Sequence, residues 1–333
     1  MSESTQQQRL LSPEEIAVRA GESQPFLRLP ESTVFGERAM RLRQLAARQD
    51  ALRDYLLFIA SVAELQHEQL KQAVALQLPD AAQIEAAAHA GRPPLPAALW
   101  PREALWRDEL RALLGRLALR LGPGTAQDVA QALRAASDEH LETQAERLLG
   151  GVMLGLDLGT APLIAAGLQL HWMRLVRQTQ AAHAGARIAP FGRTDAATLC
   201  PCCGSRPVAS VTRLGTDGGR LLHCGLCAAE WHYVRIKCAH CESTKGIHYE
   251  NLQAAGDAQP GSAQAVQAEC CDECGRYLKI VHMEKDHQVE PLADDLASLT
   301  LDLLVSDAGF ERAGVNLMLL FGDPDAPPDP GGR

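Results

Sequence analysis

The fold of this chain is decided by four short cysteine sequences: CPCCG at 200–204, HCGLC at 223–227, CAHC at 238–241 and ECCDECG at 269–275. They contain all ten cysteines of the 333 residues. Each includes a Cys-x-x-Cys pair, and two intervening residues let both thiolates of a tight turn point at one metal ion. The first twenty residues lack the pattern of a secretory signal, so we expect a cytoplasmic chain. Grouped cysteines in such a chain indicate metal binding rather than disulfides.

Taken in chain order, the four pairs make two predicted four-sulfur sites. The predicted metal ligands are Cys200, Cys203, Cys224 and Cys227 in the first site, and Cys238, Cys241, Cys271 and Cys274 in the second. Twenty residues separate the two pairs of the first site, which is typical of zinc sites, and 29 separate those of the second. An interleaved grouping, in which the pair at 224 and 227 joins the pair at 238 and 241, stays open. Tetrahedral sulfur suits Zn²⁺ or mononuclear iron, and spacing does not separate these metals.

Two cysteines and several histidines lie beside the predicted ligands without a place among them. Cys202 and Cys270 are substitute ligands, reactive thiols or bystanders, and we favour bystanders. A shift of one residue in the register would make Cys270 a ligand in place of Cys271. With eight cysteines available, we expect the neighbouring histidines to support the ligands or face solvent. These are His223, His232, His240 and His248.

Residues 1–190 are expected to form a helical bundle. Ser12-Pro13-Glu14-Glu15 is typical of a helix start, with a capping serine and proline in the first turn. Residues 37–77 lack Gly and Pro and carry leucines at helical spacing, which predicts at least one long amphipathic helix. Further helices are expected at about 97–121, 126–149 and 161–184, with glycine-containing breaks between them. We expect the apolar faces to form a core, and an exposed face that binds a peptide is the alternative.

After residue 190 the pattern changes to short β-branched and aromatic runs at 208–211, 231–236 and 277–282, which predict hairpins that carry the cysteine turns. Residues 253–268 have turn formers and no large apolar cluster, and predict a solvated loop. From residue 290 the pattern is helical again. Its leucines at 292, 296, 299 and 303 share one face, and the aspartates at 294, 295 and 302 lie off that face. The tail at 323–333 is expected to be disordered.

Charge and motifs exclude several classes of function. Acidic residues outnumber basic ones by nine, and residues 200–287 contain nine basic against ten acidic side chains. A nucleic-acid module normally has the opposite balance, so we expect no nucleic-acid partner. The most apolar long window, 152–170, contains Asp157 and several Gly and Pro, so we expect no membrane insertion. Phosphate-binding, nucleophile-elbow and zinc-protease motifs are missing from the sequence, so we expect no enzyme activity.

Four longer segments resemble the FdhE family of formate dehydrogenase accessory proteins. They are CPCCGSRPVAS from residue 200, LHCGLCAAEWHYVRIKCAHCES from 222, ECCDECGRYLKIVHMEKD from 269 and VEPLADDLASLTLD from 289. The order of these segments and their residues are specific to that family, whereas the cysteine pairs of a generic zinc ribbon are not. The resemblance is strongest from Cys200 to about Phe321, whereas the first half is similar in helical character and length. The doubled cysteines at Cys202 and Cys270 depart from the family pattern.

The resemblance implies an α+β, multi-domain protein. It has a helical bundle at 1–190, two rubredoxin-like or zinc-ribbon-like modules at 191–236 and 237–287, and a C-terminal helical segment at 288–322. It implies two mononuclear iron sites on the eight ligand cysteines, with zinc possible in aerobic preparations. It further implies a cytoplasmic assembly chaperone that binds the catalytic subunit of respiratory formate dehydrogenase before twin-arginine export. A rubredoxin-type electron carrier and a zinc-ribbon nucleic-acid module are the alternatives, and self-association stays open.

Overall fold

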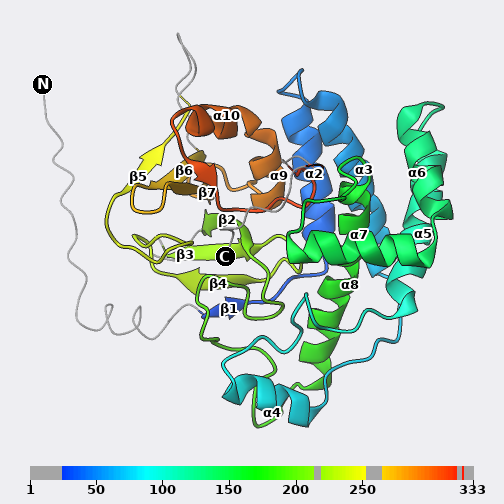
Figure 1. Cartoon of the computed structure of the whole chain (residues 1–333), viewed down its shortest axis with the longest axis horizontal. Helices are drawn as coiled ribbons and strands as arrows, with labels where there is room; N and C mark the ends of the chain where they lie inside the picture. The colour runs from blue at the N-terminus through cyan, green and yellow to red at the C-terminus, as the bar shows by residue number, and fades with distance from the viewer. Residues whose placement is uncertain (1–24, 214–218, 253–264, 321–324, 326–333) are drawn as a thin grey trace, which may run out of the picture.

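The computed structural model describes residues 25–213, 219–252, 265–320 and 325. The predicted helix start at Ser12 lies outside this part of the chain, as does the predicted tail apart from Asp325. The predicted fold class is confirmed, since a helical region is followed by a β-sheet with two cysteine clusters and by C-terminal helices. Figure 1 shows the first helices on one side of the sheet strands, and the C-terminal helices along the top.

The helical region contains seven described helices. They are α2 (Val34–Ala46), α3 (Arg53–Leu70), α4 (Ala81–His89), α5 (Ala104–Arg120), α6 (Thr125–Ala135), α7 (Asp138–Gly150) and α8 (Ala161–Ala182). The stretch without Gly or Pro forms a hairpin of two helices, α2 and α3. The expected single helix at 126–149 is wrong, because the Ser137 side chain accepts a hydrogen bond from the His140 N–H and starts a new helix there.

Eight strands form one continuous sheet. They are β1 (Leu27–Arg28), β2 (Pro207–Thr212), β3 (Arg220–Cys224), β4 (Glu230–Tyr233), β5 (Ile247–Glu250), β6 (Val266–Cys271), β7 (Arg276–His282) and β8 (Glu311–Arg312). The order is β1-β4-β3-β2-β7-β6-β5, and β8 pairs with β7. The parallel pair of β2 and β7 joins the two cysteine-bearing halves. Apart from the short parallel pair of β7 and β8, the other strand pairs are antiparallel.

The predicted loop at 253–268 is wrong at its C-terminal end. Residues 266–268 belong to β6, whereas residues 253–264 are outside the described part of the chain. β6 pairs with β7 along its whole length and with β5 from Ala268 onward. These backbone hydrogen bonds form the strand without large apolar side chains.

The C-terminal segment forms two helices, α9 (Pro291–Ala297) and α10 (Leu299–Asp307), and its predicted polarity is wrong. Asp294, Asp295 and Asp302 are buried, whereas Leu303 is 59% exposed. Asp294 pairs with Arg41 of α2 at 2.6 Å, and Lys279 of β7 reaches Asp302 at 2.5 Å. Buried cations therefore hold the aspartates inside, where the pattern predicted solvent.

The main apolar core extends from the helical region into the first cysteine cluster. It includes Trp106 and Trp172 of the helices, the cysteines of the first cluster and Leu292 of α9. The described helices include none that is long and apolar enough to cross a membrane. The first cluster is thus placed between the helices and the sheet.

Candidate metal centre

All four Cys-x-x-Cys pairs adopt the same turn. The residue after the second cysteine has a positive φ in each: 73° at Gly204, 59° at Ala228, 63° at Glu242 and 64° at Gly275. Its N–H donates to the carbonyl of the first cysteine of the pair at 2.8–3.1 Å. Glycine after the second cysteine gave a sequence signal for two of these turns. Ala228 and Glu242 gave none, because the backbone contacts of the turn hold them in a conformation that side chains disfavour.

The first cluster brings together the sulfurs of Cys200, Cys203, Cys224 and Cys227, all buried and within 4.8 Å of one another. The Sγ atoms of Cys203 and Cys224 are 3.5 Å apart, and those of Cys200 and Cys227 are 3.6 Å apart. A tetrahedral ion with Zn–S bonds of about 2.3 Å needs sulfurs about 3.8 Å apart. Disulfide sulfurs would be about 2 Å apart. The cluster therefore has the dimensions of a metal cage.

The second cluster brings together the sulfurs of Cys238, Cys241, Cys271 and Cys274. The Sγ atoms of Cys241 and Cys271 are 3.7 Å apart, and those of Cys238 and Cys274 are 3.8 Å apart. Both groups follow chain order, so the interleaved grouping is not the one that the structure contains. Four thiolates at tetrahedral separations fit Zn²⁺ or mononuclear iron in each cluster.

Backbone N–H groups support the sulfurs from within the turns. The N–H groups of Leu226 and Cys227 donate to the Cys224 sulfur at 3.4 Å, and the His240 N–H donates to the Cys238 sulfur at 3.4 Å. Such donors stabilise the negative charge of a metal-bound thiolate. Burial raises the pKa of Cys224 and of Cys227, so a metal ion that binds here displaces protons.

Residues of the helical region form hydrogen bonds to the turns of the first cluster. Leu95 and Ala97 donate their N–H groups to the carbonyls of Cys202 and Cys203 at 3.2 and 2.8 Å. The Gln169 side chain of α8 donates to the carbonyl of Gly225, inside the second turn, at 2.7 Å. The sequence gave no signal for these contacts, because they join residues far apart in the chain. They make the first cluster a joint between the helices and the sheet.

The second cluster differs in its exposure. Cys241 is exposed and Cys274 is partly exposed, whereas Cys238 and Cys271 are buried. Its sulfurs come from the segment between β4 and β5 and from the turn between β6 and β7. A metal ion in this cluster is therefore closer to solvent than one in the first.

Cys202 and Cys270 belong to neither cluster. Both are buried. Burial raises the pKa of Cys202, and burial together with nearby carboxylates raises the pKa of Cys270 to about 12. A buried thiol that keeps its proton is a poor nucleophile, which favours the bystander interpretation.

None of the four nearby histidines belongs to a cluster. His223 is buried, and its Nδ1 lies 3.0 Å from Glu230. Burial alone would raise the pKa of Glu230, but hydrogen bonds from His223 and Arg213 lower it to about 2. His240 accepts from the exposed Arg206, and His248 lies near Glu250 and Asp272. These contacts orient the residues around the clusters.

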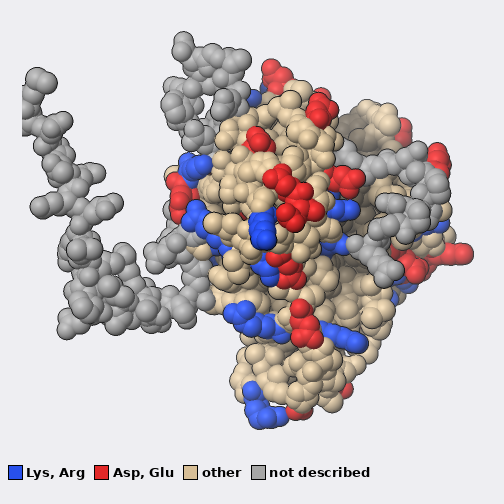
Figure 2. Space-filling view, turned by 60° about the vertical axis from the view of Figure 1, so that its left-hand side comes forward, with Lys and Arg blue, Asp and Glu red and all other residues tan. Residues whose placement is uncertain are grey.

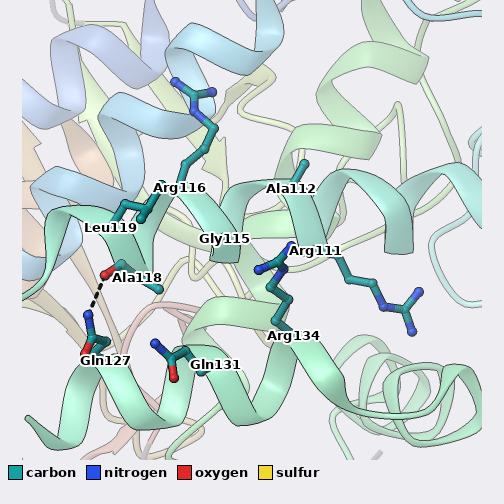
Figure 3. Close-up of a pocket in the computed structure, with 9 residues that line it drawn as sticks. All are labelled: Arg111, Ala112, Gly115, Arg116, Ala118, Leu119, Gln127, Gln131 and Arg134. Carbon is teal, nitrogen blue, oxygen red and sulfur yellow. Dashed lines mark hydrogen bonds between the residues drawn. The ribbon is translucent and has the colours of Figure 1, made fainter. Parts of the chain in front are cut away.

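A hollow of about 390 Å³ lies elsewhere, between α5 and α6 (Figure 3). Two of its arginines are neutralised, because Arg111 pairs with Asp138 at 2.6 Å and Arg116 pairs with Glu68. The Arg134 side chain reaches across toward Gly115 (Figure 3). No cysteine lines it, so it does not belong to the metal centre.

Comparison with known proteins accounts for nearly the whole described chain. Residues 24–186 match the family described as FdhE, N-terminal. Residues 199–235 match the FdhE central domain, and residues 236–319 match the FdhE C-terminal domain. The chain belongs to the FdhE family. The matches extend the resemblance from the cysteine region to the helical region.

Whole-chain relatives of the FdhE family agree with this assignment. The Protein FdhE homolog of Cronobacter sakazakii is 39% identical over 307 residues, which cover 92% of this chain and 94% of that protein. Protein FdhE of Salmonella paratyphi B is 38% identical over the same shares. The crystal structure of the FdhE protein from Pseudomonas aeruginosa is 35% identical, with a TM-score of 0.76 over 90% of this chain and all of that chain.

Proposed function

We propose that this chain is an assembly factor for respiratory formate dehydrogenase. It binds the catalytic subunit in the cytoplasm, before twin-arginine export, and turns over no small molecule itself. Its membership of the FdhE family supports this role, and the observation that carries the metal part is the pair of four-sulfur cages.

The eight cysteines of the two cages are the proposed ligands of two mononuclear iron ions. Iron bound by four thiolates is redox-active, whereas zinc is not. The protein's own contribution is to hold the sulfurs at tetrahedral separations and to stabilise their charge by backbone N–H groups. Metal analysis after anaerobic purification, together with the visible absorption of the protein, distinguishes iron from zinc.

An anaerobic pull-down of the tagged chain tests the assembly role. The host cells express respiratory formate dehydrogenase, and mass spectrometry identifies the retained proteins. We expect the catalytic subunit with the wild type. We expect its loss with Cys203→Ser, because this substitution removes one sulfur from the buried cage. Cys202→Ser is the matched control, since it changes the neighbouring thiol outside the cage. A wild type that retains no catalytic subunit contradicts the proposal.

A rubredoxin-type electron carrier is the second candidate function. The exposed Cys241 favours it, because a sulfur ligand at the surface shortens the path for electrons. A reductase partner in the pull-down, with reversible absorption changes, would support this alternative. Nucleic-acid binding has no such support: on the face in Figure 2, basic and acidic side chains are interspersed without a continuous basic patch.

A further inference from the structure

A second surface feature is a groove that runs beside the first cysteine cluster. Two hollows of about 290 and 220 Å³ share Leu148, Gly151 and Val315 in their walls, so they form one depression. We call it the α7 groove, because residues at the C-terminal end of α7 line both hollows. The other walls come from residues 314–320 and from the first two cysteine turns.

The groove is apolar and incompletely covered. Leucines at 148, 199, 226 and 317 line it, together with Met153. Val315 at the junction is 37% exposed. Val152 and Leu154, which flank the lining residue Met153 in the sequence, are 44% and 43% exposed. Exposed aliphatic side chains around an apolar hollow mark a surface that a partner covers.

The charges around the groove are of one sign. Its walls contain Arg147, Arg206 and Arg312 and no carboxylate, although the whole chain carries a net charge of −9. Arg312 pairs with Asp295 and Asp302. Arg147 donates to the Gly155 carbonyl and Arg206 to His240, and neither forms an ion pair with a carboxylate in the described chain. Two cations are therefore available to an acidic partner.

The groove is built on the first metal cage. Gly204, Ser205 and Arg206 follow Cys203 directly, and Gly225 and Leu226 lie between the two cysteines of the next turn. A side chain at Gly225 would meet the Val315 carbonyl at 3.0 Å, so this turn packs tightly against the opposite wall. The shape of the groove therefore depends on the four sulfurs that position these turns.

We propose that the α7 groove is the docking site for the catalytic subunit, through a segment that combines apolar side chains with an acidic residue. This inference rests on the proposed assembly function and adds the surface that carries it. The charge complementarity favours such a protein segment. Because the cage shapes the groove, loss of its metal weakens docking. The hollow between α5 and α6 is the rival surface, and two of its three arginines are already paired.

The test measures the dissociation constant between the metal-loaded full chain and the purified catalytic subunit, under anaerobic conditions. Val315→Asp places a carboxylate at the apolar junction of the two hollows. We expect the dissociation constant to rise at least about tenfold, which corresponds to about 1.4 kcal/mol of lost binding free energy. Arg206→Glu reverses a rim charge at an exposed position. We expect it to slow association and to reduce its dependence on salt.

Leu119→Asp is the matched control, since Leu119 is 88% exposed on α5 and lines the rival hollow. We expect wild-type affinity from it. Melting temperature and metal content show whether each variant is folded. If Val315→Asp does not fold, Arg206→Glu still tests whether the groove binds the catalytic subunit.

The possible failures are distinguishable. A wild type that binds, with both groove variants within about twofold of it, overturns the groove and leaves the assembly function intact. Weaker binding by Leu119→Asp alone assigns docking to the α5 and α6 hollow instead. A wild type that does not bind the catalytic subunit overturns the assembly function and the groove together.

Discussion

Backbone conformation is decisive at single residues of the cysteine turns. Gly275 has a φ of 64°, and a Cβ added there meets no atom within 4 Å. Any cost of a side chain at this position is therefore conformational.

We predict that Gly275→Ala lowers the free energy of unfolding by about 1 kcal/mol, the usual cost of a Cβ in the left-handed region. Gly122→Ala is the control, because Gly122 also has open space around it and no positive φ. It is expected to be neutral or slightly stabilising. Urea unfolding at equal metal content measures both, and equal stabilities for the two variants would contradict the prediction.

His171 of α8 makes stability depend on pH. Its ring is buried, packs edge-on against Trp172 with 5.3 Å between ring centroids, and has no hydrogen-bond partner for either nitrogen within the described residues. Burial lowers its pKa to about 4. The unfolded chain therefore takes up this proton first, and the stability contributed by the neutral ring is complete above about pH 6.5 and falls toward pH 4.

We predict that the wild type loses about 2 kcal/mol through this residue between pH 7.5 and 5.0. His171→Phe removes that part of the loss, because phenylalanine keeps the apolar packing and binds no proton. His89→Phe, at an exposed position of α4, should leave the pH dependence as in the wild type. Urea unfolding at both pH values checks this. The same loss in His171→Phe as in the wild type would exclude His171 as its cause.

At the scale of elements, buried ion pairs attach α2 to α9. Arg38 contacts Glu290 at 3.0 Å, and Arg41 contacts Asp294 at 2.6 Å and Asp286 at 2.8 Å. Arg38, Arg41, Glu290 and Asp294 are all buried. Removing one partner leaves a buried charge without compensation, which costs more than the pair itself contributes.

We predict that Arg41→Met lowers the free energy of unfolding by about 3–5 kcal/mol. Adding Asp294→Asn should recover most of this, because the remaining buried charge is then removed. Arg43→Met is the control on the same helix: its pair with Glu64 is exposed, and such pairs contribute about 1 kcal/mol or less. Thermal unfolding compares the three variants. A cost for Arg41→Met no larger than that for Arg43→Met would show that the buried pair does not attach the helices.

At the scale of the whole molecule, the two cages have different structural roles. The first is buried in the main core and bonded to residues 95–97 and to α8. The second has one exposed and one partly exposed sulfur. The first cage therefore joins the helices to the sheet. The second joins the segment after β4 to the turn between β6 and β7.

We predict that a chelator removes the metal of the second cage first, because opening the first cage requires disruption of the core. Native mass spectrometry over time should show a fast and a slow loss, with only the slow loss in Cys241→Ser. Cys203→Ser should lower the melting temperature of the whole chain, and Cys241→Ser should lower it less. Equal rates of loss from both cages would contradict this difference.

The sequence by itself determined the local features of this protein. Four Cys-x-x-Cys pairs in order predicted two groups of four cysteines, because a tight turn needs only neighbouring residues. Glycine and proline likewise predicted the break between α5 and α6 and the end of α7. The resemblance carried by the cysteine segments predicted the family.

Only the tertiary structure decided what depends on distant partners. Asp294 has the spacing of a solvent-facing residue, and it is buried because Arg41 lies opposite, 253 positions away in the chain. The parallel pair of β2 and β7, which makes one sheet of two halves, also depends on a long-range contact. Likewise, only the packing of α8 and residues 95–97 buries the first cage and leaves the second near solvent. Spacing records which groups are neighbours along the chain, whereas burial and ion pairing depend on which groups meet after folding.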